Sequence, residues 1–191
     1  MLAEILHKEE MNIIKTGIEG LLIIEPRVFE DGRGYFFESW SQRDFDAHVG
    51  HVRFVQDNES FSVYGVVRGL HFQKAPYTQA KLVRCVSGKV LDVAVDIRRD
   101  SPTFMQHVSV ELSAENHRML FIPKGFAHGF SVLSETAVFQ YKCDGFYNPE
   151  ADSGIQFNDS RLGIDWKIPA DRMIVSEKDK LRTPLRAEDA L

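Results

Sequence analysis

Hydrophobic and polar residues alternate along much of this chain, in short runs that are separated by turn residues. The clearest run is KVLDVAVDI, residues 89–97, where two sets of positions alternate: Leu91, Val93, Val95 and Ile97 against Val90, Asp92, Ala94 and Asp96. A period of two residues is typical of a β-strand with one buried face. The run KLVRCV precedes it, and Ser87 and Gly88 separate the two runs, so we expect a β-hairpin here.

Other segments repeat this pattern. QHVSVEL and HRMLFIP flank residues 113–116 and predict a second hairpin, while GFSVLSETAVFQYKC predicts two more strands around Ser134 and Glu135. Upstream, GLLIIEPRVF and GYFFESWS bracket a turn at residues 30–34. The one clear helical candidate is SQRDFDAHV, with Ser41 as its N-cap. Many short strands at regular spacing predict a mostly antiparallel all-β fold, which is a sandwich, a jelly roll or a barrel.

Nothing in the sequence marks a domain boundary. At 191 residues, of which 43% are hydrophobic, the chain is long enough for one well-packed domain and short for two. It contains no internal repeat, low-complexity tract or linker rich in Pro, Ser or Gly. We therefore expect one domain over residues 1–191, in which residues 1–11 form a loosely ordered extension.

Charge, the N-terminal segment and the cysteines exclude several classes of protein. The net charge is −5 and Lys and Arg are spread along the chain, which argues against nucleic acid as a partner. No apolar run approaches membrane-spanning length, and the start, MLAEILHKEEMNIIKTG, carries charges where a signal peptide needs an apolar core. We expect a cytoplasmic protein with no membrane partner, in which Cys85 and Cys143 are reduced thiols.

Two segments resemble part of a metal-binding plan. Double-stranded jelly rolls of the cupin type bind a metal through two His one residue apart on a strand, an acid ahead of a glycine turn, and a later His after a Pro-x-Gly step. The segment PKGFAH, which ends at His128, and the turn at Gly88 match that plan. The expected His pair, however, is His71 and Gln73, and Lys81 stands where the acid would be. An ammonium beside two imidazoles repels a divalent ion, so we expect no metal and no other cofactor.

A His and a Lys in one pocket can do chemistry without a metal. A His of near-neutral pKa can abstract a proton from a carbon next to a carbonyl, and a nearby ammonium can stabilise the resulting enolate oxygen. His71 lies in the apolar context VVRGLHFQ, where an unpaired imidazole is costly, so this context alone leaves it either a hydrogen-bonded structural residue or a functional one. These residue types suggest carbanion chemistry beside a ketone.

Longer motifs make the resemblance specific. The chain is similar to the dTDP-4-dehydrorhamnose 3,5-epimerase family in QDNESFSVYGVVRGLHFQ, KLVRCVSGKVLDVAVDIRRDSPTF, LSAENHRMLFIPKGFAHGFSVLSE, YKCDGFYNPEADSGIQFND and SEKD. The resemblance runs from about Gly20 to Pro184. It implies a double-stranded jelly roll of the cupin type. It also implies epimerisation at C3 and C5 of dTDP-4-dehydro-6-deoxy-D-glucose to dTDP-4-dehydro-L-rhamnose, in dTDP-rhamnose biosynthesis, by metal-free removal and return of protons next to the C4 ketone.

The resemblance also implies roles for individual residues. His71 becomes the proton acceptor, Asp179 the carboxylate that orients it, Tyr141 the proton donor on the opposite face of the sugar ring, and Lys81 a cation facing the keto oxygen. The other matched positions imply contacts with the substrate: Arg33, Glu38, Gln56, Asp57, Asn58, Arg68, His128, Tyr147, Asp152 and Lys178. Tyr147 would stack on the thymine base. From its context SEKDK alone, Asp179 would be an exposed charged turn.

Several alternatives stay open at this point. The same base and acid would serve a single-site epimerase, acting at C3 or C5 of a related nucleotide 4-keto sugar. A non-catalytic sugar-binding cupin would keep the pocket and lose turnover, although the complete His, Tyr, Lys and Asp set disfavours this. A metal-dependent cupin isomerase or oxygenase is disfavoured by Gln73 and Lys81.

The sequence also bears on assembly. A jelly roll of this size would expose a sheet edge along LLIIEPRVF, and exposed apolar edges are usually covered. We therefore expect a twofold homodimer, in which the resemblance implies that Arg33 and Glu38 reach the partner's site.

Overall fold

Two six-stranded sheets face each other in the computed structural model, which describes residues 11–186 and 191. Nearly all of the predicted N-terminal extension therefore lies outside the described residues. The first sheet has the order β1-β2-β10-β7-β12-β5, with the strands Asn12–Lys15, Leu22–Glu25, Met119–Ile122, Lys81–Ser87, Thr136–Cys143 and Gln56–Val63. The second has the order β13-β6-β11-β8-β9, with the strands Asp152–Gly154, Val66–Gln73, Phe126–Val132, Lys89–Asp96 and His107–Ser113.

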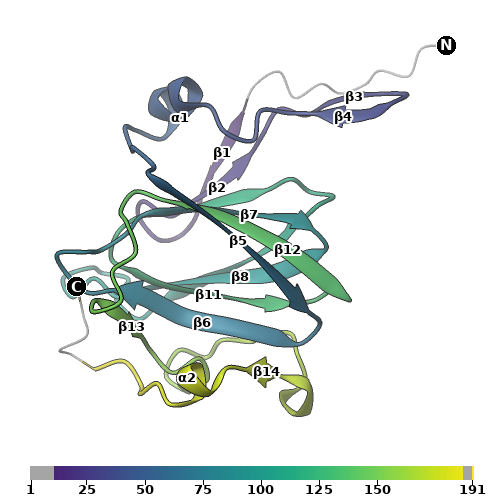
Figure 1. The fold of residues 1–191 in the computed structure, drawn as a ribbon. Coiled ribbons are helices and arrows are strands. Elements are labelled where there is room, and N and C mark those ends of the chain that lie inside the picture. The colour runs from purple at the N-terminus through teal and green to yellow at the C-terminus, as the bar shows by residue number, and fades with distance from the viewer. Residues whose placement is uncertain (1–10, 187–190) are drawn as a thin grey trace.

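All strand pairs are antiparallel within the described residues except one: β14, Ile174–Val175, runs parallel to β6. The predicted all-β class is confirmed, and the two sheets form a jelly roll (Figure 1). Helices are few and short: α1 is Gln42–His48, η1 is Ala170–Arg172 and α2 is Glu177–Lys180. No helix in residues 11–186 has the length and apolar character needed to cross a membrane.

Consecutive strands mostly cross from one sheet to the other, and both predicted hairpins are therefore wrong. β7 belongs to the first sheet and β8 to the second, while β9 belongs to the second and β10 to the first. Gly88 makes the corner between β7 and β8 with a φ of +77°, and a Cβ there would lie 2.0 Å from the Thr136 carbonyl oxygen. A turn signal between two strands is common to a hairpin and to such a corner.

The strand β8 is buried on both faces, whereas its sequence predicted one. Val90 and Ala94 lie in the core between the sheets. The other face packs under the chain that follows β13, in a cluster that contains Leu91, Val93, Val95, Ile97, Ile155, Leu162, Trp166 and Leu185. The chain that follows β13 thus covers the outer face of the second sheet, as Figure 1 shows below β6.

The outer face of the first sheet is covered by α1 and the chain around it. Ser41 caps this helix, as predicted, by accepting a hydrogen bond from the Asp44 N–H at 3.3 Å. The helix buries Phe45 against Trp40 and Phe54. The strands β3, Phe29–Asp31, and β4, Gly34–Phe36, form the predicted turn at residues 30–34 and project from the body as a ribbon (Figure 1).

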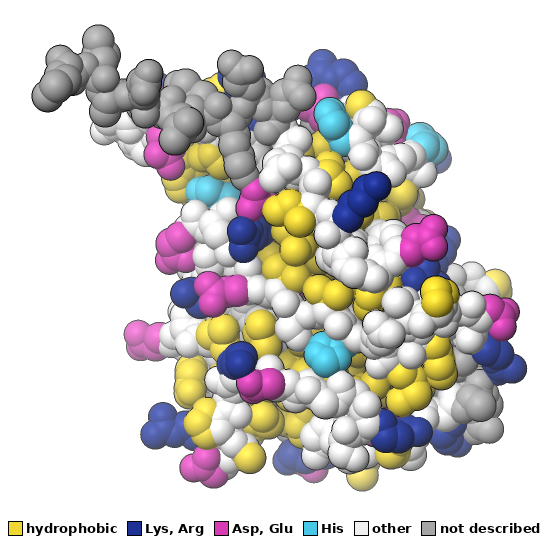
Figure 2. Space-filling view, turned by 180° about the vertical axis from the view of Figure 1, so that it is seen from behind, with side chains coloured by type: hydrophobic (Ala, Val, Ile, Leu, Met, Phe, Trp, Pro, Cys, Tyr) yellow, Lys and Arg dark blue, Asp and Glu magenta, His cyan; other side chains and the backbone are white. Residues whose placement is uncertain are grey.

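The predicted exposed edge along LLIIEPRVF is not an edge in its first half. β2 is paired on one side with β1 and on the other with β10. The outermost strands of the first sheet are β1 and β5. On the face drawn in Figure 2, basic and acidic side chains of the described residues are interspersed with hydrophobic ones, in line with the even spread of charge along the sequence.

Candidate active site

His71 lies near the end of β6, beside the strand β11. Its partner across the ladder is His128, and the register shifts between His128 and Phe130. Two glycines permit this close approach, because a Cβ on Gly69 would lie 2.5 Å from the Cα of Gly129. The RGLHF and AHGF segments thereby bring the two histidines to neighbouring positions of one sheet.

Asp179 pairs with His71 from the short helix α2. The His71 Nε2 atom lies 2.6 Å from Asp179 Oδ1. Burial alone would raise the pKa of Asp179, but the hydrogen bond and charge of His71, with hydrogen bonds from Ser176 and the Gly69 backbone, keep this pKa below its ordinary value. Asp179 is therefore ionised and accepts the proton on Nε2. The lone pair of the imidazole then lies on Nδ1, which can take up a proton.

The burial of Asp179 differs from the exposed turn that its sequence context predicted. Its side chain is 5% exposed, against 36% for His71. Ser176, the N-cap of α2, accepts a hydrogen bond from the Asp179 N–H at 3.1 Å and so fixes the direction of the helix. The neighbouring strand β14 pairs with β6, which brings α2 to the edge of that strand.

A second His–Asp pair lies deeper between the sheets. His128 Nε2 lies 3.0 and 2.9 Å from the two carboxylate oxygens of Asp92 on β8. Burial lowers the pKa of His128, Lys81 and His71 lower it further, and Asp92 opposes them. Asp92 is a residue of this site that the sequence motifs do not predict. A charged residue inside a strand whose other positions are nearly all hydrophobic was the available signal.

Lys81 begins β7 and points into the space between the sheets. Its Nζ lies 5.9 Å from the centroid of the Tyr141 ring. Burial lowers the pKa of Lys81, while Cys143, Asp92 and Asp152 favour its charged form. The ammonium therefore lies near Asp92 and Asp152 of the second sheet, where it can stabilise a negative charge that develops between the sheets.

Tyr141 faces inward from β12. Its phenol is half-buried, and burial together with Cys143 raises its pKa above the ordinary value, while Arg68 opposes them. A raised pKa keeps the phenol protonated at neutral pH, as a proton donor requires. Arg68 lies on β6 and its Nε donates a hydrogen bond to the Ser62 hydroxyl on β5 at 3.1 Å, which links the two strands at the opening between the sheets.

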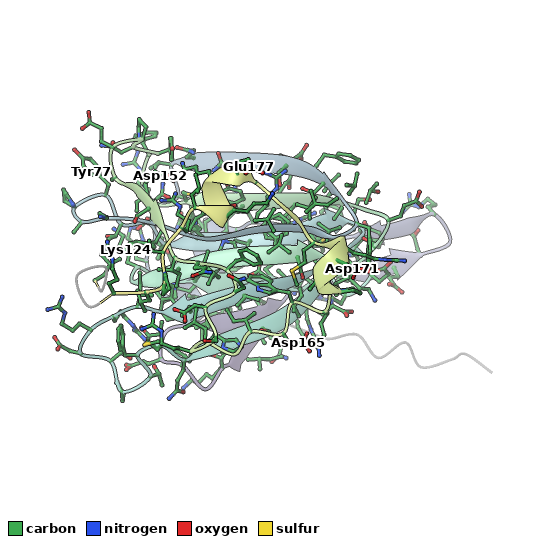
Figure 3. The ribbon with its side chains drawn as sticks, turned by 90° about the horizontal axis from the view of Figure 1, so that it is seen from below. Tyr77, Lys124, Asp152, Asp165, Asp171 and Glu177 are labelled. Carbon is green, nitrogen blue, oxygen red and sulfur yellow. The ribbon has the colours of Figure 1, made fainter. Side chains whose placement is uncertain are left out.

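A cleft of about 340 Å³ opens beside His71. It is lined by Val66, Val67, Arg68, His71, Asp152, Ile174, Val175, Ser176, Lys178 and Asp179. One carboxylate oxygen of Asp152 receives the Lys178 ammonium and, at 3.0 Å, the Arg182 guanidinium. Burial raises the pKa of Asp152, but these two cations lower it below its ordinary value. Figure 3 shows Asp152 close to α2, which carries Glu177.

The strand β5 divides its predicted substrate-binding residues between two faces. Gln56 and Asn58 are joined by a hydrogen bond of 2.9 Å, and Gln56 Oε1 accepts the Tyr147 N–H at 3.0 Å. Asp57 points to the opposite face, as the alternation of a strand requires, where it is 69% exposed and pairs with Lys142 at 2.9 Å. Gln56, Asn58 and the Tyr147 backbone thus form one group, from which the Asp57 side chain is separated.

Comparison with known proteins identifies the family. A family model described as dTDP-4-dehydrorhamnose 3,5-epimerase matches residues 15–187. This chain belongs to that family. It is 56% identical to the dTDP-4-dehydrorhamnose 3,5-epimerase of Escherichia coli K12 over 171 residues, which cover 89% of this chain and 92% of the relative.

Solved structures of this epimerase family have the same fold. The dTDP-4-dehydrorhamnose 3,5-epimerase of Elizabethkingia anophelis is 55% identical with a TM-score of 0.88, over 92% of this chain and 96% of that one. The dTDP-6-deoxy-D-glucose-3,5-epimerase of Legionella pneumophila, in complex with dTDP-4-keto-L-rhamnose, is 49% identical with a TM-score of 0.90, over 95% of this chain and 97% of that one.

Two predicted residues of the epimerase site lie apart from this group within one chain. Arg33 is in the turn of the β3–β4 ribbon, where its side chain is 91% exposed and pairs with Asp31 at 2.6 Å. Glu38 follows β4 and is exposed as well. Neither lines the cleft beside His71. Of the predicted site residues, Arg68, His71, Asp152, Lys178 and Asp179 line that cleft. The others do not line it: Asp57, Gln56, Asn58, Lys81, His128, Tyr141 and Tyr147.

The position of a second metal-binding His is occupied by Gln73, whose amide holds two loops together. Its Nε2 donates to the Tyr77 carbonyl at 2.9 Å, and its Oε1 accepts the Asn148 N–H at 2.7 Å. Within residues 11–186 and 191, no group of three or more His, Cys, Asp or Glu side chains is arranged to hold a metal ion.

Proposed function

We propose that this chain inverts C3 and C5 of dTDP-4-dehydro-6-deoxy-D-glucose and forms dTDP-4-dehydro-L-rhamnose. The observation that carries this proposal is the His71–Asp179 pair, at 2.6 Å, at a cleft in a chain that belongs to the 3,5-epimerase family. The hydrogens on C3 and C5 are acidic because each carbon neighbours the C4 ketone. A neutral imidazole whose Nε2 proton is bound by a carboxylate is a base suited to remove them.

The charge and burial of Lys81, Tyr141 and His128 support the roles that we propose for them. When His71 takes the proton, the electron pair moves to the ketone oxygen, and the Lys81 ammonium stabilises the enolate without transferring its own proton. Tyr141 then returns a proton to the other face of the same carbon, which inverts it. His128, held by Asp92, lines the same space and hydrogen-bonds the sugar. One cycle at C3 and one at C5 give the product.

We propose that the nucleotide lies along the opening between β5 and β6. Gln56, Asn58 and the ring of Tyr147 would hold the base and deoxyribose. The diphosphate is attracted by Arg68 and by Lys178, whose present partner is Asp152. Asp57 would take part only indirectly, through its ion pair with Lys142.

The assembly is also a proposal. We propose a cytoplasmic homodimer of single-domain chains, in which the exposed β3–β4 ribbon carries Arg33 and Glu38 into the partner's site. The position of both residues outside the cleft of their own chain supports this. Exposed aromatic side chains on the ribbon, Phe29, Tyr35 and Phe36, give such a contact an apolar component.

The test is to incubate the purified protein with dTDP-4-dehydro-6-deoxy-D-glucose in heavy water. We expect deuterium at both C3 and C5, and conversion to the rhamno configuration detected by NMR. Deuterium at one carbon alone would indicate a single-site epimerase. No incorporation at either carbon would refute the proposal in favour of a sugar-binding cupin.

A further inference from the structure

Three strand ends meet where Lys81 enters the first sheet. β7 begins at Lys81, which pairs with Ile122, the last residue of β10, and with Cys143, the last residue of β12. Residues 74–80, immediately before Lys81, belong to no strand. The ladders therefore hold the backbone of Lys81 on its C-terminal side, and another contact must hold it on the N-terminal side.

That contact comes from a cluster of three residues, Ala80, Lys124 and Asp144, which we call the strand-end clasp. The Ala80 N–H donates to Asp144 Oδ1 at 2.7 Å, and the Asp144 N–H donates to the Ala80 carbonyl at 3.2 Å. The other carboxylate oxygen of Asp144 pairs with Lys124 Nζ at 3.1 Å. The clasp thus joins the chain after β10, before β7 and after β12.

The clasp is enclosed. Ala80 is 4% exposed, and the Asp144 side chain is 13% exposed. Because the Ala80 amide is out of contact with water, loss of its acceptor would leave a buried donor unpaired. Nearby, Gln79 Nε2 donates to the Gly145 carbonyl at 2.6 Å and attaches the same two loops once more.

We propose that Asp144 is a positioning residue for Lys81, acting through the Ala80 backbone. The inference rests on the proposed function, in which Lys81 faces the ketone. A Lys side chain has four rotatable bonds, so a small change in the direction of its Cα–Cβ bond moves the ammonium much further. By fixing the residue before Lys81, the Asp144 carboxylate sets that direction and directs the ammonium toward the Tyr141 ring and the sugar. Figure 3 places Lys124 at the same end of the molecule as Tyr77 and Asp152.

A double-mutant cycle tests the inference. Asp144→Ala should lower the turnover of the dTDP-4-keto sugar by about 10- to 100-fold, the usual effect of a small misplacement of a reacting group, and leave the Kd for dTDP unchanged. In a Lys81→Met background, Asp144→Ala should lower turnover no further. Asp165→Ala, which removes an exposed ion pair with Lys167 at 2.5 Å, is the matched control and should leave turnover unchanged.

A second readout needs no substrate. Burial lowers the pKa of Lys81, so release of its side chain by Asp144→Ala should raise that pKa toward the ordinary value. The pKa is measured by NMR of labelled lysine, with the Lys81 signal assigned by its absence in Lys81→Met. If the wild-type protein does not turn over the dTDP-4-keto sugar, the proposed function is refuted. The difference in Lys81 pKa between the wild-type protein and Asp144→Ala tests the clasp in that case as well.

Two results would overturn the inference. The first is wild-type turnover in Asp144→Ala together with an unchanged Lys81 pKa. The second is that Asp144→Ala lowers turnover by the same factor in the Lys81→Met background as in the wild-type protein. Asp144 would then affect turnover independently of Lys81. Should Asp144→Ala fail to fold, Asp144→Glu replaces it in the same cycle. This variant keeps the charge and moves the carboxylate by one methylene, and the same two results decide.

Discussion

Tyr141 and His71 divide the proton transfer at the residue scale, because inversion requires a proton to leave one face of a carbon and return to the other. Tyr141→Phe keeps the ring and removes only the acidic hydrogen. We expect this variant to exchange substrate hydrogen with solvent through His71, while net inversion falls by roughly 10²- to 10⁴-fold, the usual contribution of a positioned acid. Deuterium incorporation and product formation are measured in the same NMR sample.

His71→Ala is the matched comparison, and it should abolish exchange and inversion together. Inversion at the wild-type rate in Tyr141→Phe would show that another residue or a water is the donor. The raised pKa of Tyr141, which burial causes, supports the phenol as the acid at neutral pH.

Lys81 acts at the same scale as a fixed positive charge. Removal of one preorganised donor to a developing oxyanion lowers turnover by about 10²- to 10³-fold, so Lys81→Met should lower kcat by that factor. The Kd for dTDP, measured by calorimetry, should stay close to the wild-type value. A variant that binds dTDP much more weakly would instead assign Lys81 to the phosphates.

At the scale of elements, the connection from β8 to β9 is held by a buried carboxylate. Asp96 is 0% exposed and receives Arg98 at 2.8 Å, the Ser101 hydroxyl at 2.6 Å and the Thr103 hydroxyl at 2.7 Å. Burial alone would raise its pKa, but these hydrogen bonds lower it to about 2. The folded chain therefore binds the Asp96 proton less readily than the unfolded chain.

The stability that Asp96 contributes therefore falls as the pH is lowered. The pKa of Asp96 is lower in the folded chain than in the unfolded chain, so ionised Asp96 stabilises the fold. This contribution to the free energy of unfolding is about 2 kcal/mol; it is present above about pH 4 and is lost as the pH falls toward 2. Asp96→Asn should lower the free energy of unfolding by about this amount at pH 7 and flatten its decline between pH 4 and 2. Urea unfolding at several pH values measures both effects, with the exposed Asp171→Asn as control. An unchanged decline would contradict the assignment.

The strand assignments show what local pattern can and cannot specify at this scale. The period of two residues located β7, β8, β9, β10, β11 and β12 in their segments. It did not identify their partners, because the alternation states which side chains share a face and says nothing about which strand lies alongside. The Ser87–Gly88 signal therefore predicts a hairpin, whereas Gly88 makes a corner between the sheets.

At the scale of the whole molecule, the proposed dimer predicts that two inactive variants restore each other. In a mixed dimer of Arg33→Ala and His71→Ala chains, one site receives wild-type His71 from one chain and wild-type Arg33 from the other. After unfolding and refolding of an equimolar mixture, about one quarter of the wild-type turnover should return, because half of the dimers are mixed and each has one intact site.

Each variant refolded alone is the control and should stay inactive. If no activity returns on mixing, Arg33 acts in its own chain, whereas an active Arg33→Ala control would show that Arg33 has no role in turnover. Light scattering gives the mass independently, and a fully active monomer at micromolar concentration would refute the exchange of residues between sites.

The sequence by itself determined the strand-rich class, the N-cap at Ser41, the turn at residues 30–34 and the motifs that resemble the epimerase family. These features depend on residues close together along the chain, so a local pattern is sufficient to encode them. The family resemblance also named His71 and Asp179 together, although SEKDK alone predicted an exposed turn.

Only the tertiary structure decided which strands pair, that both faces of β8 are buried, and that Asp179 is enclosed against His71. It also paired Asp92 with His128 and turned Asp57 away from Gln56. Each of these results depends on contacts between segments far apart in the chain, and on which surface the C-terminal segment covers. Local periodicity holds no information about such contacts, because the same alternating strand can pack against many partners.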